Sequence, residues 1–141
     1  MTDNTEHQVT IAKSGVVYGD IIYWGAIAGA VLALIGSILT FTTTQNYIDP
    51  NYLLSSILEG KSVEAIWQGA EGIGQRPDGH WYLDQLMTGN GLTMAGMALG
   101  VFSVIPGLLG AGYILATREK APLYAMLAFI AALITTGAMF A

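Results

Sequence analysis

Long uncharged apolar runs alternate with polar segments along the chain, and this pattern predicts three membrane-crossing helices. After a polar segment at residues 1–20, we place the first span at 21–43. The next uncharged stretch predicts a span at 91–117, and a third span at 121–141 follows the charged turn 118–120. About 20 apolar residues cross the hydrocarbon core, so each run is long enough. The expected fold class is an all-α membrane protein with three transmembrane helices.

A cleaved secretory signal is the alternative interpretation of the first apolar run. Such a signal has a basic start and an apolar core of about 7–15 residues. Here the leader is mildly acidic and the apolar run is longer. A retained transmembrane helix is therefore the interpretation that we favour.

Pro106 lies inside the second predicted span. Proline has no backbone N–H and commonly kinks a helix. Membrane helices tolerate such a break when neighbouring groups satisfy the freed carbonyl. We therefore expect an irregularity in this helix near Pro106.

The segment 44–90 is too long to be a simple connection, and we expect it to form short helices of its own. Asp49-Pro50 has the pattern of a helix N-cap followed by proline in the first turn, and Ser62 could cap a second helix. A third short helix is predicted over residues 80–87. Six acidic residues against two basic ones give this outer loop a net charge of −4. Short helices that carry such aromatic residues lie at a membrane interface or on the outer surface of a partner. The residues that we expect for docking on the loop are Trp67, His80, Trp81 and Tyr82.

Basic residues in short loops indicate the orientation of the spans, because they tend to stay in the cytoplasm. Arg118 and Lys120 lie in the short turn 118–120, and Lys13 lies on the same side of the membrane. We therefore expect the N-terminus inside, and the loop 44–90 and the C-terminus outside. The expected location is a prokaryotic cytoplasmic membrane.

Small residues recur at helical spacing in all three spans, and each set falls on one helix face. Such stripes let membrane helices approach closely. The expected packing residues are Gly25, Gly29, Ala33 and Gly36 in the first span, Gly96, Gly100, Ser103, Gly107 and Gly110 in the second, and Ala125, Ala128 and Ala132 in the third. Packing among the three helices of one chain is the simpler interpretation, and a stripe that faces another subunit is the alternative. A bulky side chain at Gly100 is expected to weaken helix association.

Composition agrees with a lipid environment and excludes several classes of function. The chain of 141 residues is 53% hydrophobic and only 11% charged, whereas soluble domains carry about a quarter charged residues. The absence of cysteine excludes disulfides, thiolate nucleophiles and cysteine-held clusters within this chain. A net charge of −5 argues against nucleic acid as a partner.

Few residues offer chemistry, and each has a simpler structural interpretation. Asp20 could be a carboxylate of a quinone or proton-entry site, but a helix N-terminus also favours an acid there. His80 could bind a metal together with nearby acids, although a surface histidine beside a turn is more common. The side chains of Met94, Met97 and Phe102 could line a quinone or lipid groove, or could simply fill a core. We predict no catalytic residue, cofactor or metal.

The sequence resembles an uncharacterised family of small three-span bacterial and archaeal membrane proteins. The resemblance rests on the glycine pattern from Gly25 to Gly36, the step Ile105-Pro106-Gly107 and the segment Arg118-Glu119-Lys120-Ala121-Pro122-Leu123-Tyr124. It covers the spans and not the loop 44–90. An arginine that often follows the proline in that family is replaced by Gly107 and Leu108. The resemblance implies a three-span topology and no activity.

The expected function is that of a non-catalytic accessory or structural subunit in a larger electron-transfer or transport assembly. Its partners would be the lipid bilayer and other membrane subunits. The alternative is a homo-oligomeric channel or small transporter with an acidic outer mouth. Against a channel, the spans carry few polar residues beyond Ser37, Ser103, Thr135 and Thr136. An enzyme is the least favoured class, because the span cores carry no ionisable residue.

Overall fold

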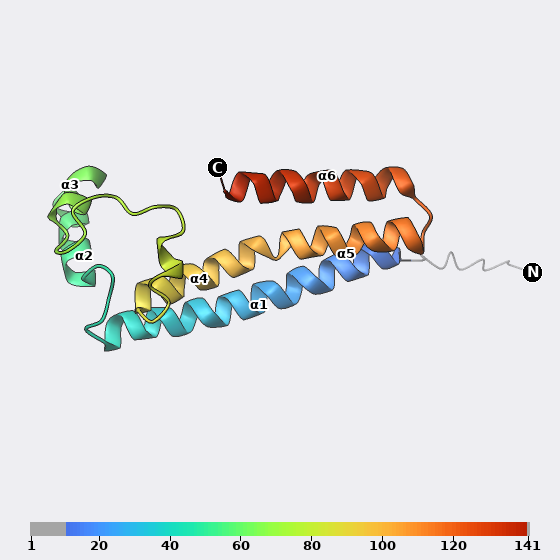
Figure 1. Cartoon of the computed structure of the whole chain (residues 1–141). Helices are drawn as coiled ribbons and strands as arrows, with labels where there is room; N and C mark the ends of the chain where they lie inside the picture. Colours follow the sequence, from blue (N-terminus) through green and yellow to red (C-terminus); the bar gives the residue numbers. More distant parts are fainter. Residues whose placement is uncertain (1–10, 141) are drawn as a thin grey trace, which may run out of the picture. The chain divides into compact units, whose positions relative to one another are not determined.

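The computed structural model describes residues 11–140, and every regular element within them is a helix (Figure 1). In chain order the elements are α1 (Lys13–Thr42), α2 (Pro50–Leu58), α3 (Val63–Gly69), the short 3-10 helix η1 (Trp81–Leu83), α4 (Gly89–Phe102), α5 (Val104–Thr117) and α6 (Pro122–Met139). Three segments, Lys13–Thr42, Gly89–Thr117 and Pro122–Met139, are long and apolar enough to cross a membrane. The predicted fold class is confirmed. The first half of the predicted polar segment, residues 1–10, and the last residue of the third predicted span lie outside the described residues.

The first long helix begins at Lys13, eight residues before the predicted span. Its 30 residues extend over about 45 Å. Hydropathy marks the apolar part of a helix, whereas the helix itself begins where its first N–H groups find acceptors. Here the acceptor is Glu119, because the backbone N–H and the hydroxyl of Ser14 each donate to its carboxylate at 2.9 Å.

The second apolar segment is divided at Ser103 into α4 and α5. Pro106 has no N–H to donate to the carbonyl of Phe102, the last residue of α4. The helical backbone hydrogen bonds resume with Gly107, whose N–H donates to the Ser103 carbonyl at 3.1 Å. The irregularity that the sequence predicts near Pro106 is therefore present.

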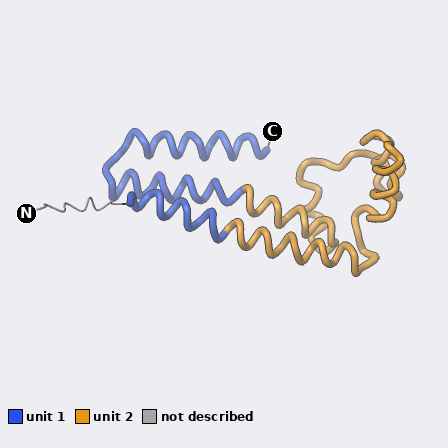
Figure 2. The backbone as a smooth tube through the Cα atoms, turned by 180° about the vertical axis from the view of Figure 1, so that it is seen from behind, with its two compact units in different colours: residues 1–24, 102–141 blue, residues 25–101 orange. Residues whose placement is uncertain are grey.

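The described chain divides into two compact units (Figure 2). The first contains residues 11–24 and 102–140, and in it α5 and α6 run side by side (Figure 1). Its buried residues are small: Ser14, Ser103, Gly107, Ala111, Gly112, Ala125 and Ala132. Close helix packing therefore forms the interior of this unit.

The second unit, residues 25–101, contains the rest of α1, the loop 44–90 and all of α4 but its last residue. The loop has a small hydrophobic core of Ile48, Ile66 and Ala70, with Tyr52, Leu53, Trp67 and Ile73 packed around it. The Tyr52 hydroxyl donates to the Ile66 carbonyl at 2.8 Å, which ties α2 to α3. The loop is thus a folded substructure and not an extended connection.

The two predicted helix caps in the loop are confirmed. The side chain of Asp49 accepts from the backbone N–H of Asn51 at 2.9 Å, and Pro50 occupies the first turn of α2. Ser62 accepts from Ala65 at 3.3 Å at the start of α3. The predicted helix over residues 80–87 is wrong in extent. Only η1 forms there, because its N–H groups bond to carbonyls three residues back in the tighter 3-10 pattern.

Candidate functional site

A close backbone seam joins α1 and α4 in the second unit. A methyl group on Gly29 would lie 2.6 Å from the carbonyl oxygen of Gly96 and 2.8 Å from the amide nitrogen of Gly100. A methyl group on Gly96 would strike the backbone of Ala33. The two helices therefore approach so closely that only glycine fits at Gly29 and Gly96.

The seam continues toward the loop through Gly36 and Gly89. A methyl group on Gly36 would lie 2.6 Å from the Thr93 hydroxyl, and one on Gly89 would strike Thr40. The hydroxyls of Thr40 and Thr93 donate to carbonyls of their own helices, at 3.0 and 2.9 Å. The polar groups along this part of the seam are thus satisfied within each helix.

Gly100 differs from its neighbours in the seam. Its backbone lies against the Gly29 position, but a side chain built on Gly100 itself would meet nothing within 4 Å. The substitution that tests the seam is therefore at Gly96, and Gly100 offers a matched control.

The remaining predicted packing residues lie in the first unit, except Gly25, which is half-buried in α1. Methyl groups on Gly107 and Gly110 would lie 3.2 Å from the Tyr18 ring and 3.0 Å from Ile21 of α1, respectively. Ser103 is buried. These distances show that α5 packs against the start of α1.

The stripe of α6 faces α5. Ala125 and Ala132 are each only 3% exposed, and Ala128 lies 3.4 Å from the position of a methyl group on Gly112. All three small-residue stripes therefore pack within the chain. They do not by themselves indicate a partner.

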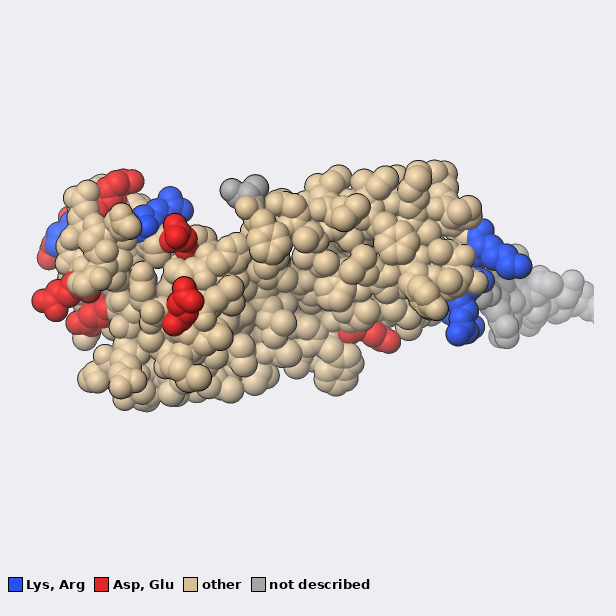
Figure 3. All heavy atoms as spheres, viewed as in Figure 1, with Lys and Arg blue, Asp and Glu red and all other residues tan. Residues whose placement is uncertain are grey.

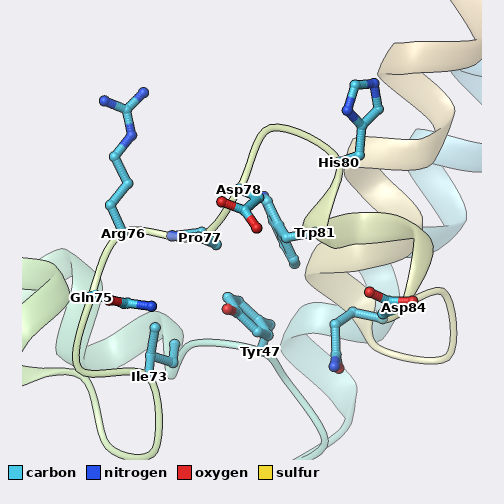
Figure 4. Close-up of a pocket in the computed structure, with 10 residues that line it drawn as sticks. Tyr47, Ile73, Gln75, Arg76, Pro77, Asp78, His80, Trp81 and Asp84 are labelled. Carbon is cyan, nitrogen blue, oxygen red and sulfur yellow. The ribbon is translucent and has the colours of Figure 1, made fainter. Parts of the chain in front are cut away.

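A polar pocket of about 410 Å³ lies in the loop 44–90 (Figure 4). Tyr47 and Trp81 stack in it with ring centroids 4.3 Å apart, and the Tyr47 backbone N–H donates to the Asn90 side chain at 3.1 Å. Figure 4 shows the Asp78 carboxylate beside Trp81, whereas the His80 ring points away from Tyr47. Among residues 11–140, no three histidine or acidic side chains are grouped to hold a metal ion.

The structure separates the four residues predicted for docking on the loop. Trp67 and Trp81 are half-buried, and both line a second, apolar groove. Tyr82 is only 5% exposed, so its expected role in docking is wrong. Its ring centroid lies 6.0 Å from that of the His80 ring.

Sequence reasoning missed Tyr47 and Asn90, which hold the loop to the start of α4. Asn90 stands between Gly89 and Gly91, and this isolated polar residue among glycines was the one local signal. Its partner lies 43 residues earlier in the chain, and no sequence pattern predicts that pairing.

Charged side chains are concentrated over the loop and at the start of α1 with the α5–α6 turn (Figure 3). In the loop, a hydrogen bond from the Lys61 ammonium to Glu59, at 2.9 Å, raises the pKa of Lys61. In the turn, the two hydrogen bonds from Ser14 lower the pKa of Glu119 below its ordinary value of 4.5. Glu119 is therefore held in its charged form as a cap on α1.

One face of α2 exposes apolar side chains outside the three apolar segments. Leu54, Ile57 and Leu58 follow one another at spacings of three and one, on the side opposite the buried Ser56. Leu58 is 78% exposed, and Val63, at the start of α3, is exposed as well. We call Leu54, Ile57, Leu58 and Val63 the α2 face. Contiguous apolar patches of this kind mark binding surfaces more often than isolated exposed residues do.

Comparisons with known proteins agree with the resemblance drawn from the sequence. A protein-family model matches residues 14–141. A protein of Archaeoglobus fulgidus, described as an uncharacterized protein, is 34% identical over 104 residues, which cover 74% of this chain and 68% of the relative. No solved structure matches.

Proposed function

The chain belongs to the family whose model matches residues 14–141, and from its apolar helices and the α2 face we propose a non-catalytic accessory subunit of a larger membrane assembly. In this proposal the three apolar segments cross a prokaryotic cytoplasmic membrane. The N-terminus lies inside, and the loop 44–90 and the C-terminus lie outside. The basic residues of the short turn, Arg118 and Lys120, favour this orientation.

The observation that carries the proposal is the α2 face. Exposed apolar residues on α1, α4, α5 and α6 need no partner, because lipid surrounds spanning helices. The α2 face belongs to the loop, where water would otherwise contact it. Burying exposed leucine and isoleucine side chains against another protein removes this unfavourable contact with water.

The acidic surroundings of the α2 face suggest the chemistry of its partner. Glu59 and Glu64 flank the face, and both are exposed. Lys61 lies between them and pairs with Glu59 at 2.9 Å, so two negative charges and one positive charge leave a net charge of −1 there. A partner surface with an apolar centre and basic residues at its rim would complement it. The expected partner is therefore an outer domain or loop of another membrane subunit with that composition.

A native gel of membranes solubilised in mild detergent tests the proposal. We expect wild-type chain to migrate in a complex whose other chains mass spectrometry identifies. Glutamine at Leu54, Ile57 and Leu58 together should release the chain from that complex. The matched control places glutamine at two other exposed positions of α2, Asn51 and Ser55, and should leave the complex intact.

A complex that survives the triple change in the α2 face would remove this surface from the proposal. Recovery of the wild-type chain only as a stable monomer would contradict the accessory role itself.

The homo-oligomeric channel has less support. The hydroxyls of Ser37, Thr135 and Thr136 donate to carbonyls of their own helices at 2.8 to 2.9 Å, so they are already satisfied. Native mass spectrometry separates the two proposals, because a closed ring of identical chains would favour the channel.

A further inference from the structure

An apolar groove of about 380 Å³ lies where the α1–α4 pair meets the outer loop. All of its lining residues belong to the second unit: Ser37, Thr40, Phe41, Tyr47, Ile48, Leu53, Trp67, Trp81, Asn90, Thr93 and Met94. Its volume falls within the range of small-molecule sites, about 300–1,000 Å³. None of the lining residues carries a charge at neutral pH.

The groove joins two apolar regions of the molecule. On one side, Phe41 and Met94 belong to the exposed apolar surface of α1 and α4, and Phe41 is 83% exposed. On the other side, Ile48, Leu53 and Trp67 belong to the hydrophobic core of the loop. A hydrocarbon chain that enters from the surface of the spans would therefore contact apolar atoms along its whole path.

Several hydrogen-bond donors of the groove have no acceptor in the protein. Within residues 11–140, the indole N–H groups of Trp67 and Trp81 have no protein acceptor, and Asn90 accepts from Tyr47 but has no acceptor for its own NH₂ group. Tryptophan N–H groups that are partly buried usually find an acceptor. The groove thus offers donors that have no protein acceptor and contains no cation, which fits a neutral carbonyl better than a phosphate or a carboxylate.

We propose that this groove binds one acyl chain of a membrane ester lipid, with the ester carbonyl accepting from Trp67, Trp81 or Asn90. The aromatic lining suits this position, because tryptophan and tyrosine are enriched where hydrocarbon meets the headgroup region. The bound lipid would fill the space between the α1–α4 seam and the loop, and so hold the loop against the membrane. The inference rests on the membrane setting proposed above, but not on any protein partner.

Quenching of tryptophan fluorescence by brominated phosphatidylcholine tests the site. The chain contains three tryptophans, so the fluorescence of the Trp24→Phe variant comes from Trp67 and Trp81 alone. We expect titration of this variant in detergent to give quenching that saturates near one lipid per chain. Ser37→Phe adds bulk to the groove and should reduce the quenching several-fold. Ser37→Ala removes the same hydroxyl without adding bulk and should leave the quenching unchanged.

A second variant that blocks the groove shows whether misfolding of Ser37→Phe could explain a loss of quenching. Met94→Phe narrows the groove from α4 and should also reduce quenching, and Ala30→Phe adds an aromatic ring on the exposed side of α1 and should not. Quenching that rises without saturation, or that neither blocking variant changes, would overturn the site. Saturable quenching by decyl-ubiquinone but not by the lipid would overturn the ester lipid in favour of a quinone.

Flotation with liposomes of phosphatidylcholine separates failure of this inference from failure of the membrane setting. A chain that floats with the vesicles but shows no saturable quenching contradicts only the groove site. A chain that does not float contradicts the membrane setting itself.

Discussion

Ser56 is a fully buried hydroxyl in the loop, with 0% of its surface exposed. Its Oγ has no hydrogen-bond partner among the described residues. A buried polar group without a partner costs about 1–3 kcal/mol, because it has lost its bonds to water. The neighbouring Ser55 is exposed, and its hydroxyl donates to the Tyr52 carbonyl at 3.0 Å.

Ser56→Ala should therefore stabilise the loop by up to about 1–3 kcal/mol. Hydrogen–deuterium exchange of the α2 and α3 amides in the purified chain measures this change as slower exchange. Ser55→Ala is the control and should change stability by less than about 0.5 kcal/mol. Faster exchange in Ser56→Ala would show that the hydroxyl stabilises the loop.

Glu119 makes a cap whose strength depends on pH. Its pKa is lower in the folded chain than the ordinary 4.5, because the charged form accepts both bonds from Ser14. The cap therefore stabilises the fold fully above pH 4.5, and this contribution disappears as the pH falls through the lowered pKa.

Glu119→Gln should lower the melting temperature at pH 7, and the difference from wild type should shrink as the pH falls below 4.5. Thermal melts followed by circular dichroism in detergent at several pH values measure this. Ser14→Ala removes one donor and should shift the melt in the same direction. Identical melting of wild type and Glu119→Gln at pH 7 would contradict the cap.

The helical elements show how far sequence patterns reach. Asp49-Pro50 and Ser62 predicted the starts of α2 and α3, because a cap bonds to N–H groups only two or three residues away. The start of α1 at Lys13 was missed, because its cap lies 105 residues along the chain. Local patterns predict elements whose determinants are local, and not those whose partners are distant.

In the candidate site, too, local sequence patterns predicted only the part whose determinants are local. Helical spacing predicted the small residues of the α1–α4 seam, since a stripe is a local property. The apolar groove could not be predicted, because it needs Tyr47, Trp67 and Trp81 from separate parts of the loop. Met94 was the one lining residue that the sequence suggested for a groove.

The α1–α4 seam predicts opposite effects for two glycines of the same helix. Gly96→Ala places a methyl group against the backbone of Ala33, which cannot move aside as a side chain can. We expect a loss of about 1–3 kcal/mol, as for other overpacked interiors. Gly100→Ala meets open space and should be neutral or slightly stabilising.

Thermal melts of the two alanine variants in the same detergent provide the comparison. Equal stability of the Gly96 and Gly100 variants would show that α1 and α4 do not approach as closely as described.

At the scale of the whole molecule, the central claim is that three apolar helices cross a membrane and place the loop 44–90 outside. The lengths of the three segments fit this claim, since about 20 residues cross the hydrocarbon core. The basic turn 118–120 supports the orientation. The accessory role and the lipid groove both depend on this arrangement.

Labelling of single cysteines with a membrane-impermeant maleimide tests this claim most directly, because the chain has no cysteine of its own. We predict that Gln75→Cys reacts in intact cells, that Ile11→Cys reacts only after permeabilisation, and that Leu34→Cys, near the middle of the predicted span 21–43, reacts in neither case. Rapid labelling of Leu34→Cys would contradict the membrane-spanning helices, and labelling of Gln75→Cys only after permeabilisation would contradict the outer position of the loop.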